Sequence, residues 1–276
     1  MTFGAAAAAI PRLEHVGQVT QGRVALSEWT KLHSLRSTRW SLLAATVLGI
    51  GLPILFGAVT SSHWGTMAAH ERADRHPLDI ALAGVNVAQL AIALLGVLVI
   101  TGEYSTGMIR ATFTAVPRRL PVLWAKIAVF GAATFALSVP IVLISFFATQ
   151  AILGRHDILQ ISFSHPGVAR SVLGGALYLM LIGVFAVAVG AIVRNTAGGI
   201  AAFAAVFFVI PPLLNILPAS WNNAVSPYLP DAAGRAMFSL THGAHELGPW
   251  PGFELFLAYT AAAITISAFL LVRRDT

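Results

Sequence analysis

The sequence predicts an all-α integral membrane protein with six transmembrane helices. Of its 276 residues, 57% are apolar and only 10% are charged, which is more apolar surface than one soluble domain buries. Six apolar runs are each long enough to cross about 30 Å of hydrocarbon as a helix. The chain has no cysteine, so disulfides, thiol catalysis and thiolate metal sites are excluded.

The predicted spans are placed by the rule that a helix needs about 20 mostly apolar residues to cross a bilayer. They are approximately residues 42–59, 82–101, 127–153, 172–193, 198–217 and 253–272. An even number of spans puts both termini on one side, and residues 21–276 form a single membrane domain. Residues 1–20 contain an alanine tract with no basic residue ahead of it, so we expect a flexible tail rather than a secretory signal.

Basic residues are concentrated on the side of the termini. Twelve of the 17 lysines and arginines fall in the tails and loops of that side, whereas seven of the 11 acids fall on the other. Because cytoplasmic loops carry the excess of lysine and arginine, we expect both termini in the cytoplasm. All six tryptophans lie near span ends, as interfacial residues do. The basic balance is therefore a topology signal, and nucleic-acid binding is not expected.

The predicted cytoplasmic loop at residues 102–126, GEYSTGMIRATFTAVPRRLPVLWAK, is longer and more polar than a helical hairpin needs. Ile109, Phe113 and Val116 recur at a helical spacing, which predicts a short amphipathic helix. We expect it to end at Pro117. Three basic residues then mark the headgroup boundary: Arg118, Arg119 and Lys126. Two interpretations stay open, an ordinary basic loop and a docking helix for a cytoplasmic partner.

A second amphipathic segment, residues 23–40, precedes the first span. Trp29 and Leu32 share one helical face, whereas Glu28 and Lys31 line another as an i,i+3 pair worth a few tenths of a kcal/mol. The segment is either a helix on the cytoplasmic membrane surface or an extension of the first span. We favour the surface helix, because the two arginines near its end would resist entering hydrocarbon.

Together these two segments resemble the permease subunit of ATP-binding-cassette exporters of the type-2 class, especially the short six-span permeases of actinobacteria. In that family the first segment, here SEWTKLHSLRSTRW, is the elbow helix. The second contains the coupling helix, which sits in a groove on the ATPase subunit. The resemblance implies elbow-helix residues Glu28, Trp29, Lys31 and Arg36. It implies ATPase-coupling residues at positions that match the family pattern, namely Glu103, Tyr104, Gly107, Arg110, Pro117, Arg118, Arg119 and Lys126.

This resemblance implies an exporter subunit of a bacterial cell membrane that is not an enzyme and binds no cofactor directly. ATP and Mg²⁺ would be held by cytoplasmic ATPase partners, and a second permease chain, either the same chain or a sibling, would pair with it in the lipid bilayer. The sequence itself also indicates that the energy for transport comes from another polypeptide. Neither of the two lysines lies in a GxxxxGK[ST] phosphate-binding loop, so we expect ATP hydrolysis on another polypeptide. No acid or base lies deep inside a predicted span, which disfavours an ion-driven carrier.

Several polar and proline-rich features have two interpretations. Asn86 and Gln89, three residues apart in the second span, either hydrogen-bond neighbouring helices or face the substrate path or the dimer seam. Pro211 and Pro212 are expected to break or kink the fifth span. Residues 211–252 then form either a re-entrant outer element, as the family has, or a surface loop.

Other chemistry is weakly indicated. Seven of the nine histidines lie in the predicted outer loops, including His242 and His245, but solvated loops explain them and no metal site is predicted. A membrane-embedded enzyme would need reactive groups converging at one depth, which the sequence does not show. A non-transporting membrane partner, such as a sensor or an assembly factor, is the alternative function. Drugs, lipids, peptides and polysaccharide precursors all stay open as substrates.

Overall fold

The computed structural model describes residues 20–273 except 74, 116–118, 156–159 and 244. In chain order its helices are α1 (Gln21–Ser34), α2 (Arg36–His63), α3 (Ala69–Ala73), α4 (Pro77–Leu82), α5 (Val85–Ser105), α6 (Met108–Ala115), α7 (Arg119–Gly154), α8 (Val168–Val193), α9 (Thr196–Ala204), the π-helical turn η1 (Ala205–Val209), α10 (Ile210–Leu214), α11 (Ala219–Val225), the 3-10 turn η2 (Ser226–Tyr228), α12 (Pro230–Ala236) and α13 (Pro249–Arg273). No strand occurs among these described residues.

Six helical segments of the described chain are long and apolar enough to cross a membrane. They are α2, α4 with α5, α7, α8, α9 through α10, and α13. The predicted all-α, six-span membrane fold is confirmed. The helices extend beyond most of the predicted runs, because a helix does not stop where hydrocarbon stops. Helix α7, with 36 residues, is about 54 Å long, so it must project well past a 30 Å core.

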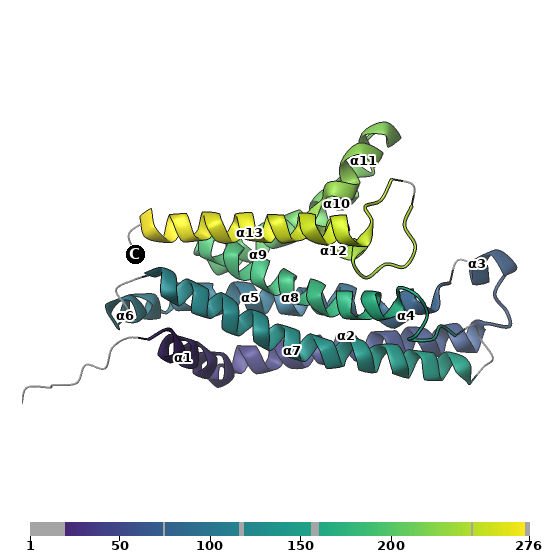
Figure 1. The fold of residues 1–276 in the computed structure, drawn as a ribbon, viewed down its shortest axis with the longest axis horizontal. Coiled ribbons are helices and arrows are strands. Elements are labelled where there is room, and N and C mark those ends of the chain that lie inside the picture. Colours follow the sequence, from purple (N-terminus) through teal and green to yellow (C-terminus); the bar gives the residue numbers. More distant parts are fainter. Residues whose placement is uncertain (1–19, 74, 116–118, 156–159, 244, 274–276) are drawn as a thin grey trace, which may run out of the picture.

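The bundle has two distinct ends (Figure 1). Helices α1 and α6 and the last residues of α13 gather at one end, which we call the proximal end. Helix α3 lies at the opposite, distal end, and α11 projects from the same half of the molecule. Helices α1 and α6, which come from the predicted segments 23–40 and 102–126, therefore lie at the same end of the bundle.

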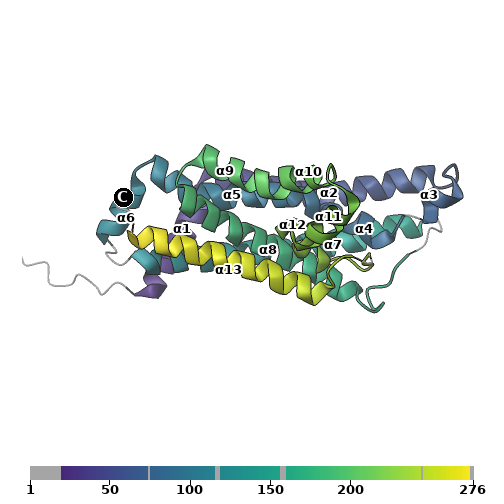
Figure 2. The same ribbon diagram turned by 90° about the horizontal axis from the view of Figure 1, so that it is seen from above.

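Helix α8 is the centre of the bundle, lying between α5 and α13 (Figure 2). It is the most buried of the six spans, and glycines on it allow neighbouring helices to approach closely. A Cβ atom at Gly183 would come within 2.8 Å of the Phe130 ring on α7. One at Gly96 of α5 would come within 2.6 Å of the Gly183 carbonyl oxygen. Small residues thus position the polar groups that these three helices carry.

The segment predicted as one helix over residues 23–40 is divided. Helix α1 begins after Thr20, whose side chain accepts a hydrogen bond from the Arg23 amide at 3.4 Å. It ends at Ser34, and the next residue, Leu35, is extended, with φ −79° and ψ 128°, so α1 is not continuous with α2. Arg36, assigned to the elbow helix, instead opens α2. The rest of the tail predicted for residues 1–20 lies outside the described residues.

At the distal end, part of the segment between the last two spans packs into the bundle. A Cβ atom at Gly234 of α12 would lie 2.4 Å from the ring of Tyr178 on α8, so the two helices are in direct contact. Pro211 and Pro212 do not interrupt the fifth span abruptly. The π-helical turn η1 precedes them and α10 continues the helix to Leu214, three residues short of the predicted end.

Candidate functional site

Four charged side chains meet at the proximal end, and we call them the four-charge cluster: Glu28, Lys31, Glu103 and Lys126. Helix α1 contributes the first two, three residues apart and therefore on one face. The last turn of α5 contributes Glu103, and the early turns of α7 contribute Lys126. Three separate helices are joined through these four residues.

The ion pairs of this cluster are short and interlocked. The Lys31 ammonium donates to Glu28 Oε1 at 2.7 Å and to Glu103 Oε1 at 3.0 Å. The Lys126 ammonium donates to Glu103 Oε1 at 2.8 Å and also to Glu28 Oε2. Each lysine thus bridges both carboxylates, and neither carboxylate belongs to one lysine alone.

These ion pairs are buried, which raises the free-energy cost of breaking them. Lys126 is 3% exposed and Glu28 4%, so their charges are held away from bulk solvent. Burial lowers the pKa of Lys31, but its hydrogen bond to Glu28 and the charges of Glu28 and Glu103 outweigh that effect and raise the pKa above its ordinary value. Lys31 is therefore an ammonium at neutral pH. Removing one member of a buried ion pair typically costs about 3–5 kcal/mol, because its partner is left unpaired.

The short helix α6 is attached to this cluster. Gly107, between α5 and α6, has φ +72°, a left-handed conformation that favours glycine and turns the chain. Ile109 is buried, and the Lys31 ammonium reaches Thr112 Oγ1 at 3.5 Å. The short helix predicted within residues 102–126 is thus present, and its first turns contact α1.

The 102–126 segment also contacts the ends of α8 and α13. The Arg194 guanidinium, just after α8, lies 5.3 Å from the centre of the Tyr104 ring and donates to the Leu270 carbonyl at 3.2 Å. Arg119 donates to the Leu271 carbonyl at 3.0 Å. Cations at the last carbonyls of a helix are favourable, so two arginines hold the end of α13 against this segment.

The other sequence-predicted residues are placed as follows. Trp29 is exposed on α1, whereas Glu28, predicted on a different helical face, is buried with Val24 and Leu32. Leu32, predicted on the same face as Trp29, thus packs inside the bundle, and the ion pairs compensate for burying Glu28 beside it. Lys126, predicted at the headgroup boundary, is buried by the same pairs, and its depth in a membrane stays a prediction. The Arg110 side chain and the residues Pro117 and Arg118 lie outside what the structure describes.

A second polar group lies in the distal half, and we call it the distal polar chain: Gln89, Tyr178, Asp231 and Arg235. The Tyr178 hydroxyl donates to Gln89 Oε1 and lies 3.4 Å from Asp231 Oδ1. Arg235 Nε donates to that same oxygen at 2.9 Å. Burial raises the pKa of Asp231, although the charge of Arg235 opposes the shift.

A cavity of about 630 Å³ opens beside the distal polar chain. Phe207, Phe208 and two prolines of the fifth span form an apolar wall, and Asp231 and Arg235 lie on its polar side. Gln89 is fully buried and hydrogen-bonded within this chain. The buried Oδ1 atom of Asn86 has no hydrogen-bond partner among the described residues. The assignment of this pair to a substrate path or dimer seam stays a prediction.

Sequence reasoning missed Asp231 and Arg235 as functional candidates. A signal existed, because Pro230 begins α12 and places Asp231 in its first turn, four residues before Arg235. Nothing local indicates that Tyr178 lies opposite. Among the described residues, no three histidine or acidic side chains gather closely enough to hold a metal ion.

Comparisons with known proteins leave this geometry as the main guide. No protein-family model matches the chain, and a search of curated proteins found no match.

Proposed function

We propose that this protein is the transmembrane permease subunit of an ATP-binding-cassette exporter, driven by a separate cytoplasmic ATPase. The observation that carries the proposal is the four-charge cluster, which joins α1, the end of α5 and the start of α7 beside the short helix α6. A push on α6 would reach the spans through side chains that are already locked together.

The composition of the contacts favours force transmission over chemistry. The cluster pairs two ammonium groups with two carboxylates, so the charges neutralise one another. Each of these residues lies within about two turns of a helix end. Arg119 and Arg194 extend the connection to the end of α13. The described part of residues 102–126 thus contacts or continues into most of the spans at the proximal end.

In this proposal the proximal end faces the cytoplasm of a bacterial cell, as the basic residues of the loops indicate. Two ATPase subunits hold ATP and Mg²⁺, and a second permease chain completes the exporter. Closure of the ATPases moves α6, and the four-charge cluster passes that motion to α1, α5 and α7. The spans then change between inward-open and outward-open arrangements.

A first experiment tests for the ATPase partner. The tagged chain is purified in mild detergent from its native host, and proteins that co-purify are identified by mass spectrometry. We expect a polypeptide with a GxxxxGK[ST] loop at a stoichiometry near one per permease chain. Recovery of the chain with other partners but no such ATPase would favour the alternative, a sensor or assembly factor.

A second experiment tests coupling in the reconstituted complex. Glu103→Gln weakens the Lys31 and Lys126 pairs, and the double change Arg118→Glu with Arg119→Glu reverses two charges beside α6. Both are expected to abolish substrate-stimulated ATPase activity while leaving membrane insertion intact. Arg75→Glu, at an exposed position between α3 and α4, is the matched control and should keep the activity. Unchanged stimulation in the first two variants contradicts the coupling role.

A further inference from the structure

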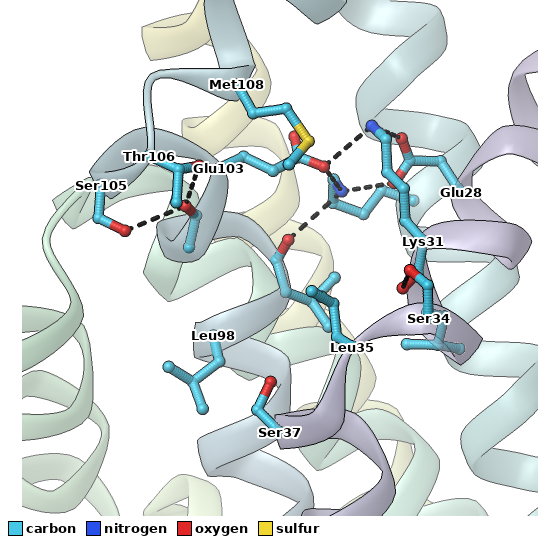
Figure 3. Close-up of a pocket in the computed structure, with 14 residues that line it drawn as sticks. Glu28, Lys31, Ser34, Leu35, Ser37, Leu98, Glu103, Ser105, Thr106 and Met108 are labelled. Atoms are coloured by element: carbon cyan, nitrogen blue, oxygen red, sulfur yellow. Dashed lines mark hydrogen bonds and ion pairs between the residues drawn. The ribbon is translucent and has the colours of Figure 1, made fainter.

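A cavity of about 220 Å³ lies against the four-charge cluster, between α1, the start of α2, the end of α5 and α6 (Figure 3). Its walls are largely apolar, and Leu32, Leu35, Leu98 and Met108 line it. A cavity needs only about 10–15 Å³ to admit one water molecule, so this cavity is large enough for much more than one water. It is large enough for a small polar headgroup and the first atoms of an attached chain.

One carboxylate oxygen of the four-charge cluster lacks a hydrogen-bond donor. Each lysine ammonium has three protons and three acceptors: Lys31 reaches Glu28, Glu103 and Thr112, and Lys126 reaches Glu28, Glu103 and the Val99 carbonyl. Both Glu28 oxygens accept one of these bonds. Glu103 Oε1 accepts two, whereas the buried Glu103 Oε2 has no partner among the described residues. Figure 3 shows dashed lines to only one of the two Glu103 oxygens.

Three of the four hydroxyl groups in the cavity wall already act as donors within the protein, the exception being Ser37. Ser34 gives its hydroxyl proton to the Lys31 carbonyl at 3.0 Å. Ser105 and Thr106 give theirs to the Gly102 carbonyl at 3.0 and 2.8 Å. These three oxygens keep lone pairs that can accept a hydrogen bond, as does the unpaired Glu103 Oε2. A group with several N–H donors fits these acceptors better than an anion or a carbonyl does.

The surroundings of the cavity indicate an amphiphile rather than a soluble amine. Leu35 and Met108 are partly exposed at its rim, and Leu26 and Trp29 of α1 are exposed nearby in the chain. Exposed apolar residues at the end of a transmembrane bundle lie where lipid headgroups meet acyl chains. Arg36, which follows the lining residue Leu35, is exposed and suits a phosphate.

We propose that this cavity binds the headgroup of a zwitterionic phospholipid with a primary ammonium, of the phosphatidylethanolamine kind. The ammonium donates to Glu103 Oε2 and the neighbouring hydroxyl oxygens, and the phosphate stays at the rim toward Arg36. The formal charges of the cluster cancel, and the phosphate of the lipid balances its own ammonium. The lipid would complete the contact between α1, α5 and α6. The site does not depend on an ATPase partner.

The test compares lipids that differ only in the donor. The purified full-length chain in neutral detergent is titrated with phosphatidylethanolamine, phosphatidylcholine or phosphatidylglycerol of identical acyl chains, and bound lipid is counted by native mass spectrometry. Phosphatidylcholine has the same charge but no N–H donor. We expect phosphatidylethanolamine to bind about tenfold more tightly, as the loss of one charge-assisted hydrogen bond predicts.

A cavity-filling variant locates the site. Gly102 lines the cavity and a Cβ atom there would meet open space, so Gly102→Leu is expected to reduce the lipid preference from about tenfold to below about twofold. Gly51→Leu, at another open helical glycine away from the cavity, is the matched control and should keep the preference. Equal binding of the three lipids, a preference for phosphatidylglycerol, or an unchanged preference in Gly102→Leu each overturns the proposal.

Discussion

The two polar groups of this bundle are built differently. At the proximal end, the four-charge cluster has two cations and two anions, and every ammonium proton has an acceptor. In the distal half, the polar chain has one carboxylate, one tyrosine and one amide inside the bundle. Its cation, Arg235, has a side chain that is 41% exposed beside a cavity of about 630 Å³.

This difference indicates different mechanical roles. A buried and mutually paired network resists rearrangement, because separating any pair leaves a charge without compensation. Moving a carboxylate away from its partner costs less free energy beside an open cavity, because water can take the partner's place. The π-helical turn and the two prolines beside the distal cavity also weaken the regular helix there. In our proposal the proximal ends of the helices move as one unit, and the distal ends rearrange in response.

The largest effect is expected at the proximal end. Lys126→Met leaves two buried carboxylates with one ammonium, so the free energy of unfolding should fall by about 3–5 kcal/mol. Denaturation of the purified protein in detergent measures it. Arg75→Met, at an exposed distal position, is the control and should change stability little.

A double variant sharpens this prediction. Adding Glu28→Gln to Lys126→Met removes the opposite charge, so part of the lost stability should return, with a coupling of about 0.5–3 kcal/mol. Strictly additive losses would mean that the two residues do not act as a pair.

A smaller effect is expected in the distal chain. Tyr178→Phe removes the hydroxyl that donates to Gln89, leaving a buried amide oxygen without a donor, at a cost of about 1–3 kcal/mol. Tyr228→Phe, at an exposed tyrosine, is the matched control. The same denaturation assay applies. A loss for Tyr178→Phe as large as that for Lys126→Met would erase the contrast between the two groups.

The smallest effect is a pH dependence at Asp231. Its pKa is raised in the folded chain, mainly by burial, above the ordinary value of 3.8. The folded state therefore holds this proton more tightly than the unfolded state does. That stability is present below the unfolded pKa and is lost as the pH rises through the folded pKa.

Asp231→Asn removes this dependence. The stability of the natural chain minus that of the variant should fall as the pH rises from about 4 to about 7. Denaturation curves at several pH values measure the difference. A difference that grows with pH would show that the pairing of Asp231 with Arg235 outweighs its burial.

Local patterns predicted the helices well but not which residues of α1 pack inside the bundle. Six spans, a short helix before Pro117 and an irregular segment after the fifth span all followed from hydropathy and proline placement. The partners of α1 did not, because its periodicity placed Glu28 and Lys31 on one face without showing what that face contacts. In the folded chain Glu28 is buried and Trp29 exposed, since the pairs with Lys31 and Lys126 compensate for burying a carboxylate.

The sequence by itself determined that this is a six-span membrane protein, because the match between an apolar run and the thickness of a bilayer is local. It also singled out Glu103 and Lys126 within one segment. Only the tertiary structure decided that Glu28 lies between the two lysines and that Asp231 reaches Tyr178. These partners are 98 and 53 residues apart along the chain, and they meet only because glycines on α8 and ion pairs on α1 hold the helices together.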